Sequence, residues 1–100
     1  MNVGRFHFDE PVRIGDGYWC PTGGVFLILC RRNGTRLEPV HIGEVGGLRR
    51  KIGPQHRLWE KMHKVCKHPF VAFHPLPMCT NTQRKIRVQS VRGFLSFYHT

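Results

Sequence analysis

The sequence predicts one α+β domain in which a three-stranded antiparallel sheet, with its strands in the order second, first, third, is flanked by about three helices. Residues 25–30 are six consecutive apolar residues, which is typical of a strand buried on both faces. Asn33-Gly34 follows, and both residues tolerate the positive φ angles of a two-residue hairpin turn. Further along, apolar residues recur at helical spacing in two segments, from Leu58 and up to Tyr98.

The strands are predicted in order from this hairpin. Residues 37–42 form the second strand, and Pro39 places it at an edge of the sheet because proline cannot donate a ladder hydrogen bond. Residues 25–30 are the most apolar and therefore take the central position. A third strand, residues 70–74, is bounded on both sides by proline.

Three helices are predicted around the sheet. A glycine-rich loop, residues 43–47, leads into a short basic helix over residues 48–52, and Gly53-Pro54 ends it and starts the next. Thr80-Asn81-Thr82 offers an N-cap for the last helix. The apolar stripes of the second and last helices are Leu58, Trp59, Met62, Val65 and Cys66, and Val91, Phe94, Leu95 and Tyr98. No glycine or proline ends the last helix before the sequence stops at Thr100. Two interpretations stay open: the sequence is a truncated piece of a longer protein, or the protein itself is shortened.

Residues 1–22 are predicted to be an N-terminal extension of a core formed by residues 23–100. Residues 3–8 alternate loosely between apolar and polar, which indicates a short accessory strand. Tyr18-Trp19 precedes the central strand. This aromatic pair either caps one end of the core or stacks on a nucleic-acid base.

Charge is the dominant feature of the composition. Sixteen Lys and Arg against six Asp and Glu give a formal charge of +10. Such a surface attracts polyanions, and nucleic acid is the first candidate, ahead of acidic membranes and acidic proteins. The alternative is that the charge serves solubility alone. No apolar run reaches the ~18 residues of a membrane span, so no membrane partner is expected. The four cysteines form no CxxC pair and have no secretory context, so we expect reduced cysteines and a cytoplasmic protein.

The order of strand, tight turn, strand, glycine-rich loop and basic segment is similar to that of the GIY-YIG nuclease domain. Gly24-Val25-Phe26 stands where the family has its first motif, and His41-Ile42-Gly43 where it has its second. Leu48 and the basic residues 49–52 stand at the leucine and the arginine-bearing helix, and His56 at a histidine that many members carry. The resemblance covers most of the core and implies the fold predicted above.

The resemblance also implies hydrolytic cleavage of phosphodiesters with one divalent metal ion, by a strand tyrosine, a helix arginine and a glutamate. The two tyrosine positions hold Phe26 and His41, and the arginine position holds Lys51, beside Arg50. The glutamate position has no carboxylate, since no acidic residue follows Glu60. A hard cation such as Mg²⁺ needs oxygen ligands, so we expect the family's ordinary mechanism to be lost.

A rebuilt catalytic centre is the alternative. It would combine His41, Lys51 and His56 with a carboxylate from Glu44 or Glu60, and would use Mg²⁺ or Mn²⁺; otherwise no cofactor is expected. More simply, Glu44 is a solvated loop carboxylate, and Glu60 pairs with a lysine one helical turn on.

Zinc is a further possibility that the residue types raise. His63, Cys66, His68, His74 and Cys79 lie within seventeen residues. Their spacing matches no standard finger or ribbon, and Cys66 falls on an apolar helix face, so a core cysteine is the simpler interpretation.

The resulting hypothesis is a catalytically degenerate GIY-YIG-like domain that binds nucleic acid, DNA ahead of RNA, through a basic face. The alternatives are an active metal-dependent endonuclease and a protein-interaction module that recognises an acidic partner. A third basic cluster is Arg84, Lys85 and Arg87. The residues expected to contact phosphate are Arg49, Arg50, Lys51, His56, Arg31 and Arg32.

Overall fold

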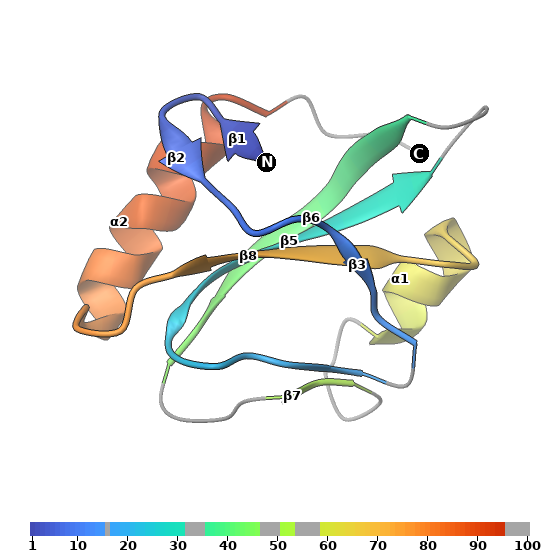
Figure 1. Cartoon of the computed structure of the whole chain (residues 1–100), viewed down its shortest axis with the longest axis horizontal. Helices are drawn as coiled ribbons and strands as arrows, with labels where there is room; N and C mark the ends of the chain where they lie inside the picture. Colours follow the sequence, from blue (N-terminus) through green and yellow to red (C-terminus); the bar gives the residue numbers. More distant parts are fainter. Residues whose placement is uncertain (16, 32–35, 47–50, 54–58, 96–100) are drawn as a thin grey trace.

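A computed structural model describes residues 1–15, 17–31, 36–46, 51–53 and 59–95, and these residues form a mostly β fold (Figure 1). Within them the chain has eight strands and two helices. In chain order they are β1 (Asn2–Val3), β2 (Phe6–His7), β3 (Val12–Arg13), β4 (Tyr18–Trp19), β5 (Gly24–Arg31), β6 (Leu37–Val45), β7 (Lys51–Ile52), α1 (Trp59–Val65), β8 (Phe70–Pro75) and α2 (Asn81–Arg92).

The central sheet has four antiparallel strands in the order β3-β8-β5-β6, and two small ladders, β1–β2 and β4–β7, accompany it. The predicted fold class, a three-stranded sheet with about three helices, is therefore wrong. Two features of the chain explain the difference. The N-terminal segment adds β3 to the free edge of β8, and Lys51–Ile52, predicted as part of a basic helix, is instead a strand that pairs with β4.

Within the central sheet, the three strands predicted from the sequence keep the predicted order, β6-β5-β8. The most apolar strand, β5, is central, and β6 is at the edge. The register slips by one residue where Ile28 faces His41 but Leu29 faces Pro39, which leaves Val40 as the extra residue of a bulge. Because proline has no N–H to donate to the ladder, it is tolerated in an edge strand beside a bulge.

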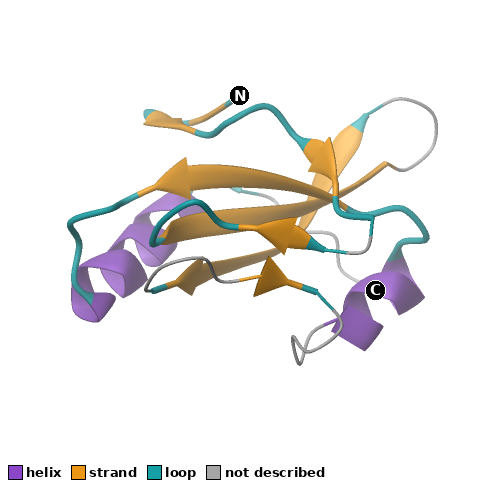
Figure 2. Cartoon of the chain, turned by 60° about the horizontal axis from the view of Figure 1, so that its bottom comes forward, coloured by secondary structure: helices purple, strands orange, loops and turns teal. Residues whose placement is uncertain are grey.

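Each face of the sheet is covered by a different set of elements, and Figure 2 shows the two helices at opposite ends of the sheet. Alternate residues of β5 divide between two core clusters, because successive side chains of a strand point to opposite faces. Val25 and Leu27 pack with α2 and the β1–β2 hairpin. Phe26 and Ile28 pack with α1 and with the segments around β4 and β7.

The N-terminal residues predicted as one accessory strand instead form the β1–β2 hairpin. Gly4 has φ +57°, a left-handed conformation that glycine adopts without strain. A Cβ atom at Gly4 would also lie 2.6 Å from the ring of Phe94, which packs directly on this turn. The turn therefore needs glycine for two reasons.

Helix α2 starts as predicted. The Thr80 hydroxyl accepts a hydrogen bond from the Gln83 amide at 3.2 Å, and the Thr80 amide donates to the Gln83 side chain at 2.7 Å. Val91 is fully buried, as predicted. The helix ends at Arg92, however, so Phe94 lies beyond it and is 58% exposed, and Tyr98 lies outside the described residues.

Candidate nucleic-acid interface

Four of the residues expected to contact phosphate, Arg32, Arg49, Arg50 and His56, lie outside the described residues. Lys51 lies on β7, where its backbone faces Trp19 of β4. The contacts predicted for these five residues therefore stay predictions.

The residues of the proposed rebuilt catalytic centre are not brought together on β6. His41 faces Ile28 across the ladder, and its ring centroid is 5.8 Å from that of Phe26, on the side of the sheet that carries α1. Glu44 lies three residues on, so it points to the other side, where it accepts a hydrogen bond from the Nε atom of Arg84 at 2.8 Å. Glu60 is exposed on α1. Among the described residues, no group of three or more His, Cys, Asp or Glu side chains could hold a metal ion.

Two arginines of the third predicted basic cluster have internal partners. Arg84 pairs with Glu44 and also donates from Nη1 to the Cys79 carbonyl at 2.7 Å, with only 12% of its side chain exposed. Arg87 donates to Nε2 of His74 at 2.7 Å, and its Cζ atom is 5.0 Å from the centroid of the Phe6 ring. Both arginines therefore connect α2 to the rest of the fold, rather than serving mainly as surface charges.

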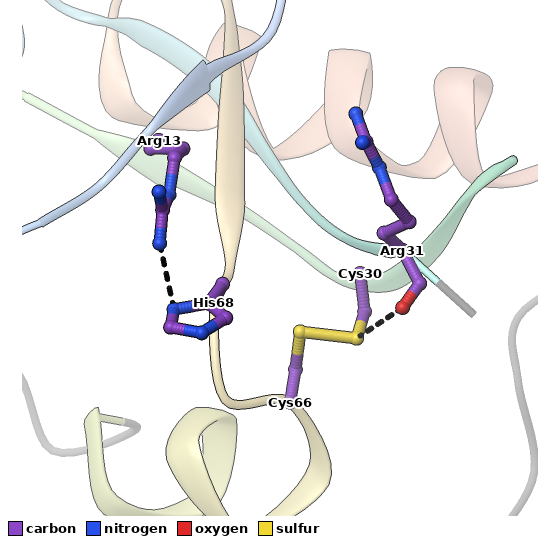
Figure 3. The surroundings of a disulfide bond; sticks show 5 residues. All are labelled: Arg13, Cys30, Arg31, Cys66 and His68. Carbon is purple, nitrogen blue, oxygen red and sulfur yellow. Dashed lines mark hydrogen bonds between the residues drawn. A yellow bond between two sulfur atoms is a disulfide. The ribbon is translucent and has the colours of Figure 1, made fainter. Parts of the chain in front are cut away.

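Two of the candidate zinc ligands, Cys66 and His74, have partners of another kind. Cys66 forms a disulfide with Cys30, with the two Cα atoms 5.8 Å apart (Figure 3). The expectation of reduced cysteines is therefore wrong for this pair. His74 is held between Arg87 and the His7 carbonyl, to which its Nδ1 atom donates at 2.6 Å.

Two cysteines are free, Cys20 and Cys79. Cys20 is fully buried, and desolvation by burial raises the pKa of its thiol from the ordinary 9.0 to about 11. A buried thiol of this kind is chemically inert at neutral pH.

Basic residues lie where β3 and β5 end, where β8 begins, and where α1 leads into the loop before β8. We call this region the basic end; its described residues are Arg13, Arg31, Arg36, Lys64, Lys67 and His68, and all of them are exposed. Register places Arg13 opposite Phe70, and Phe70 opposite Leu29, so β8 lies between the two arginine-bearing strands. Two strand spacings separate β3 from β5 by about 10 Å.

Two of the three arginines of the basic end, Arg13 and Arg31, contact uncharged groups. The Nη2 atom of Arg13 donates to Nδ1 of His68 at 2.7 Å (Figure 3). Because arginine side chains only donate hydrogen bonds, Nδ1 of His68 is the acceptor, and the ring proton is on Nε2. The Cζ atom of Arg31 lies 5.4 Å from the centroid of the Phe70 ring, a cation–π contact. Neither partner neutralises the guanidinium charge.

Among the described residues, no carboxylate forms an ion pair with a residue of the basic end. Between described residues, the ion pairs are those of the N-terminal ammonium with Glu10 and of Arg84 with Glu44. Glu38 is the carboxylate nearest in register, but it faces Cys30 and therefore points to the side of the sheet opposite to Arg31. In the described part of the chain, the charges of the basic end are therefore not paired with carboxylates.

Sequence reasoning identified Arg31 but missed Arg13, Lys67 and His68. Arg13 and His68 are 55 residues apart in the chain, and the pairing of β3 with β8 brings them together. The apolar residues on either side of Arg13 were a signal for this strand, but two residues are too few for a periodic pattern.

Two aromatic sites lie on the α1 side of the sheet. Tyr18 is half-buried, with its ring centroid 6.2 Å from that of Phe73, whereas Trp19 next to it is 60% exposed. Trp59 is half-buried at the start of α1, and its ring lies 4.5 Å from that of His63. Trp19 is thus the more exposed of the two tryptophans.

A groove of about 390 Å³ lies between β6 and α2, away from the basic end. It is at the Val45 end of β6, whereas the basic end adjoins the Leu37 end. Its lining residues are Gly43, Glu44, Thr82, Lys85, Ile86, Val88 and Gln89. Of the charged residues in this lining, Glu44 pairs with Arg84, and Lys85 has no ion-pair partner among the described residues.

Comparisons with protein-family models, with curated proteins and with solved structures find no match to this chain. The resemblance to the GIY-YIG domain therefore stays a prediction from the sequence. In the part of the chain that the structure describes, no helix is long and apolar enough to cross a membrane.

Proposed function

We propose that this protein binds nucleic acid, and that the basic end of the sheet contacts the phosphate backbone. The observation that supports this most directly is the way Arg13 and Arg31 are held. Each guanidinium has a fixed neighbour, His68 or the Phe70 ring, and neither neighbour carries a negative charge.

Such an arrangement favours an anion for two physical reasons. A free arginine loses up to about 2 kcal/mol of side-chain entropy when it is immobilised, and part of that loss has already been incurred where a neighbour holds it. A guanidinium also has five N–H donors, so Arg13 can contact His68 and still bind an oxyanion through a second edge.

The remaining residues of the basic end fit the same ligand. Lys64 and Lys67 add two mobile charges beside the fixed arginines, and neutral His68 presents an Nε2–H donor. Phosphates repeat along a nucleic-acid strand, so several cations at one end of the sheet can contact more than one of them. Binding through phosphates carries little sequence information, and we expect weak sequence preference.

Charge-removal variants test this proposal. The double substitution Arg13→Ala and Arg31→Ala should weaken binding to a mixed-sequence oligonucleotide by at least about tenfold at 0.1 M salt, since each phosphate contact is charge-assisted. The matched control is Arg5→Ala with Lys85→Ala, which removes the same charge from exposed positions elsewhere. An equal loss in both variants would show a response to net charge alone and would reject the basic end as the site.

A further inference from the structure

We infer that the outer edge of β6 and the groove beside α2 form a second binding site, for an extended acidic segment of a partner protein. The segment adds a strand to β6 through its backbone and places alternate side chains in the groove. This site is separate from the proposed nucleic-acid surface, because the groove lies at the Val45 end of β6 and the basic end adjoins the Leu37 end.

Strand β6 is an edge strand in the described part of the chain, where it pairs with β5 alone. In an antiparallel ladder, the N–H and C=O groups of every second residue point away from the partner strand. Two of the four residues Ile42–Val45 therefore direct their backbone groups away from β5. Such a row of groups is a template for a further strand.

The two ends of β6 differ in how well they can accept a strand. At the Leu37 end, Pro39 has no N–H to donate, and the bulge at Val40 interrupts the register. Natural edge strands use both devices to prevent pairing with other chains. From Ile42 to Val45 the register with β5 is regular, and these residues include no proline. The part of β6 without these devices is thus the part beside the groove.

The groove receives side chains of the added strand. Its α2 wall includes residues at positions i, i+3, i+4 and i+7 of one helix face, Thr82, Lys85, Ile86 and Gln89. Ile86 is 61% exposed although it is large and apolar. A strand added to β6 lies about 4.8 Å from it, and every second side chain points to the face that carries α2. Apolar side chains at these positions cover Ile86, and removing this apolar surface from water stabilises the complex.

The charges in and around the groove favour an acidic segment. Lys85 is exposed and has no ion-pair partner among the described residues, whereas Glu44 pairs with Arg84 at 2.8 Å. The groove therefore presents one positive charge that a carboxylate of the partner can match. The formal charge of +10 adds a long-range attraction for acidic partners and repels basic ones.

Two other occupants match this edge less well. A second copy of the chain would bring another charge of +10 and a second Lys85 to the same surface. The phosphates of a nucleic acid accept hydrogen bonds, whereas the β6 edge presents both donors and acceptors at strand spacing. A peptide backbone supplies both kinds of group in the matching order.

The probe for this site is a short peptide of sequence ETVTVTE with blocked ends, composed mainly of strand-favouring residues. Its glutamate and valine side chains share one face, and its symmetric sequence presents a carboxylate in either strand direction. The matched peptide KTVTVTK has the opposite charge. At low salt, fluorescence polarisation should show at least about tenfold tighter binding of ETVTVTE than of KTVTVTK, and added salt should reduce this ratio.

Protein variants locate the contact. Ile86→Glu places a negative charge in the groove and should weaken binding of ETVTVTE at least about tenfold. Val12→Glu is the matched control, since Val12 is 46% exposed on β3 at the opposite edge of the sheet, and it should change the affinity less than about twofold. Lys85→Glu should remove the preference for the acidic peptide, whereas Lys64→Glu on α1 should keep it. Circular dichroism checks that each variant is folded.

Backbone pairing has a readout of its own. In the complex with ETVTVTE, alternate amides of Ile42–Val45 should gain protection from hydrogen exchange, measured by NMR, because they donate to the peptide. No binding of ETVTVTE up to about 1 mM, equal binding of both peptides, or unchanged protection of these amides would overturn the inference. A dimer of the unmodified protein that Ile86→Glu dissociates would assign the edge to a second copy and would also overturn it.

Discussion

The Cys30–Cys66 disulfide should be the largest single contribution to the stability of the α1 side of the sheet. It joins the end of β5 to the residue directly after α1, across a sequence separation of 36 residues. In the chain-entropy description, closing a loop of that length in the unfolded state stabilises the folded state by about 4 kcal/mol at 25 °C. Total stabilities of small domains are about 5–15 kcal/mol, so this is a large fraction.

The local structure explains why little else replaces this link. Helix α1 has seven residues, far fewer than the roughly 12–15 that an isolated helix needs in water. Met62 is its buried anchor, at 4% exposure, and Trp59 is half-buried. Without the disulfide, the loop that carries Lys67 and His68 loses its covalent attachment to β5, so the basic end should loosen as well.

Urea unfolding, followed by far-UV circular dichroism, measures this contribution. The protein should lose roughly 2–5 kcal/mol on addition of a dithiol that reduces the bond. Cys30→Ala with Cys66→Ala should lower the stability similarly and make it insensitive to the dithiol, and Cys79→Ala is the matched control with the bond intact. An unchanged unfolding midpoint in the dithiol would refute the reasoning, as would mass spectrometry that finds four free thiols in the native protein.

Three other substitutions test particular contacts. Thr80→Ala should lower the free energy of unfolding by about 0.5–2 kcal/mol through loss of the capping box, with Thr82→Ala, one residue inside the helix, much less harmful. Arg84→Ala should destabilise by about 1–3 kcal/mol in thermal or urea unfolding, because it leaves a partly buried carboxylate and a carbonyl unpaired, and the exposed Lys85→Ala should stay within about 0.5 kcal/mol. Burial raises the pKa of the Cys20 thiol from 9.0 to about 11, so the unfolded chain releases this proton at a lower pH than the folded protein does. The free energy of unfolding should therefore fall by on the order of 2–3 kcal/mol as the pH rises from 9 to 11. The stability of Cys20→Ala should fall less steeply over this range, and a parallel decline in both proteins would contradict the assignment.

The sequence predicted the elements whose signals are local. A six-residue apolar run is enough to identify the central strand, and a proline inside a polar-apolar strand is enough to place β6 at the edge. The start of the last helix was predicted from the N-cap signal of Thr80-Asn81-Thr82, and Thr80 is its N-cap. Each of these signals lies within a few consecutive residues of the sequence.

The wrong predictions concern contacts that are distant in the sequence or elements too short for periodicity. Pairing of β3 with β8 joins residues almost 60 positions apart, and each strand of the N-terminal hairpin has two residues. The run at residues 49–52 is basic, and tertiary pairing with β4 overrides any helix preference at Lys51–Ile52.

The disulfide escaped prediction for a similar reason. Its cysteines are 36 residues apart and belong to no spacing motif, so their meeting depends on how α1 packs against β5. A disulfide is typical of proteins in oxidising compartments, so a cytoplasmic location stays a prediction from the sequence.

For the candidate site, the net charge can be predicted from the composition, but the positions of the charged groups cannot. Arg84 and Arg87, which form a basic cluster in the sequence, are used inside the fold, whereas the isolated Arg13 lies with Arg31 at the basic end. Whether an arginine has a carboxylate, a carbonyl or a ring beside it cannot be read from composition.

The dependence of nucleic-acid affinity on salt tests the central claim most directly. Four phosphate contacts, by Arg13, Arg31, Lys64 and Lys67, predict a slope of log K against log salt of roughly −3, at 0.7–0.9 for each neutralised phosphate. The double substitution of both arginines should reduce the magnitude of that slope by about 1.5. A flat salt response of the unmodified protein, or an unchanged slope after both arginines are removed, would contradict the account.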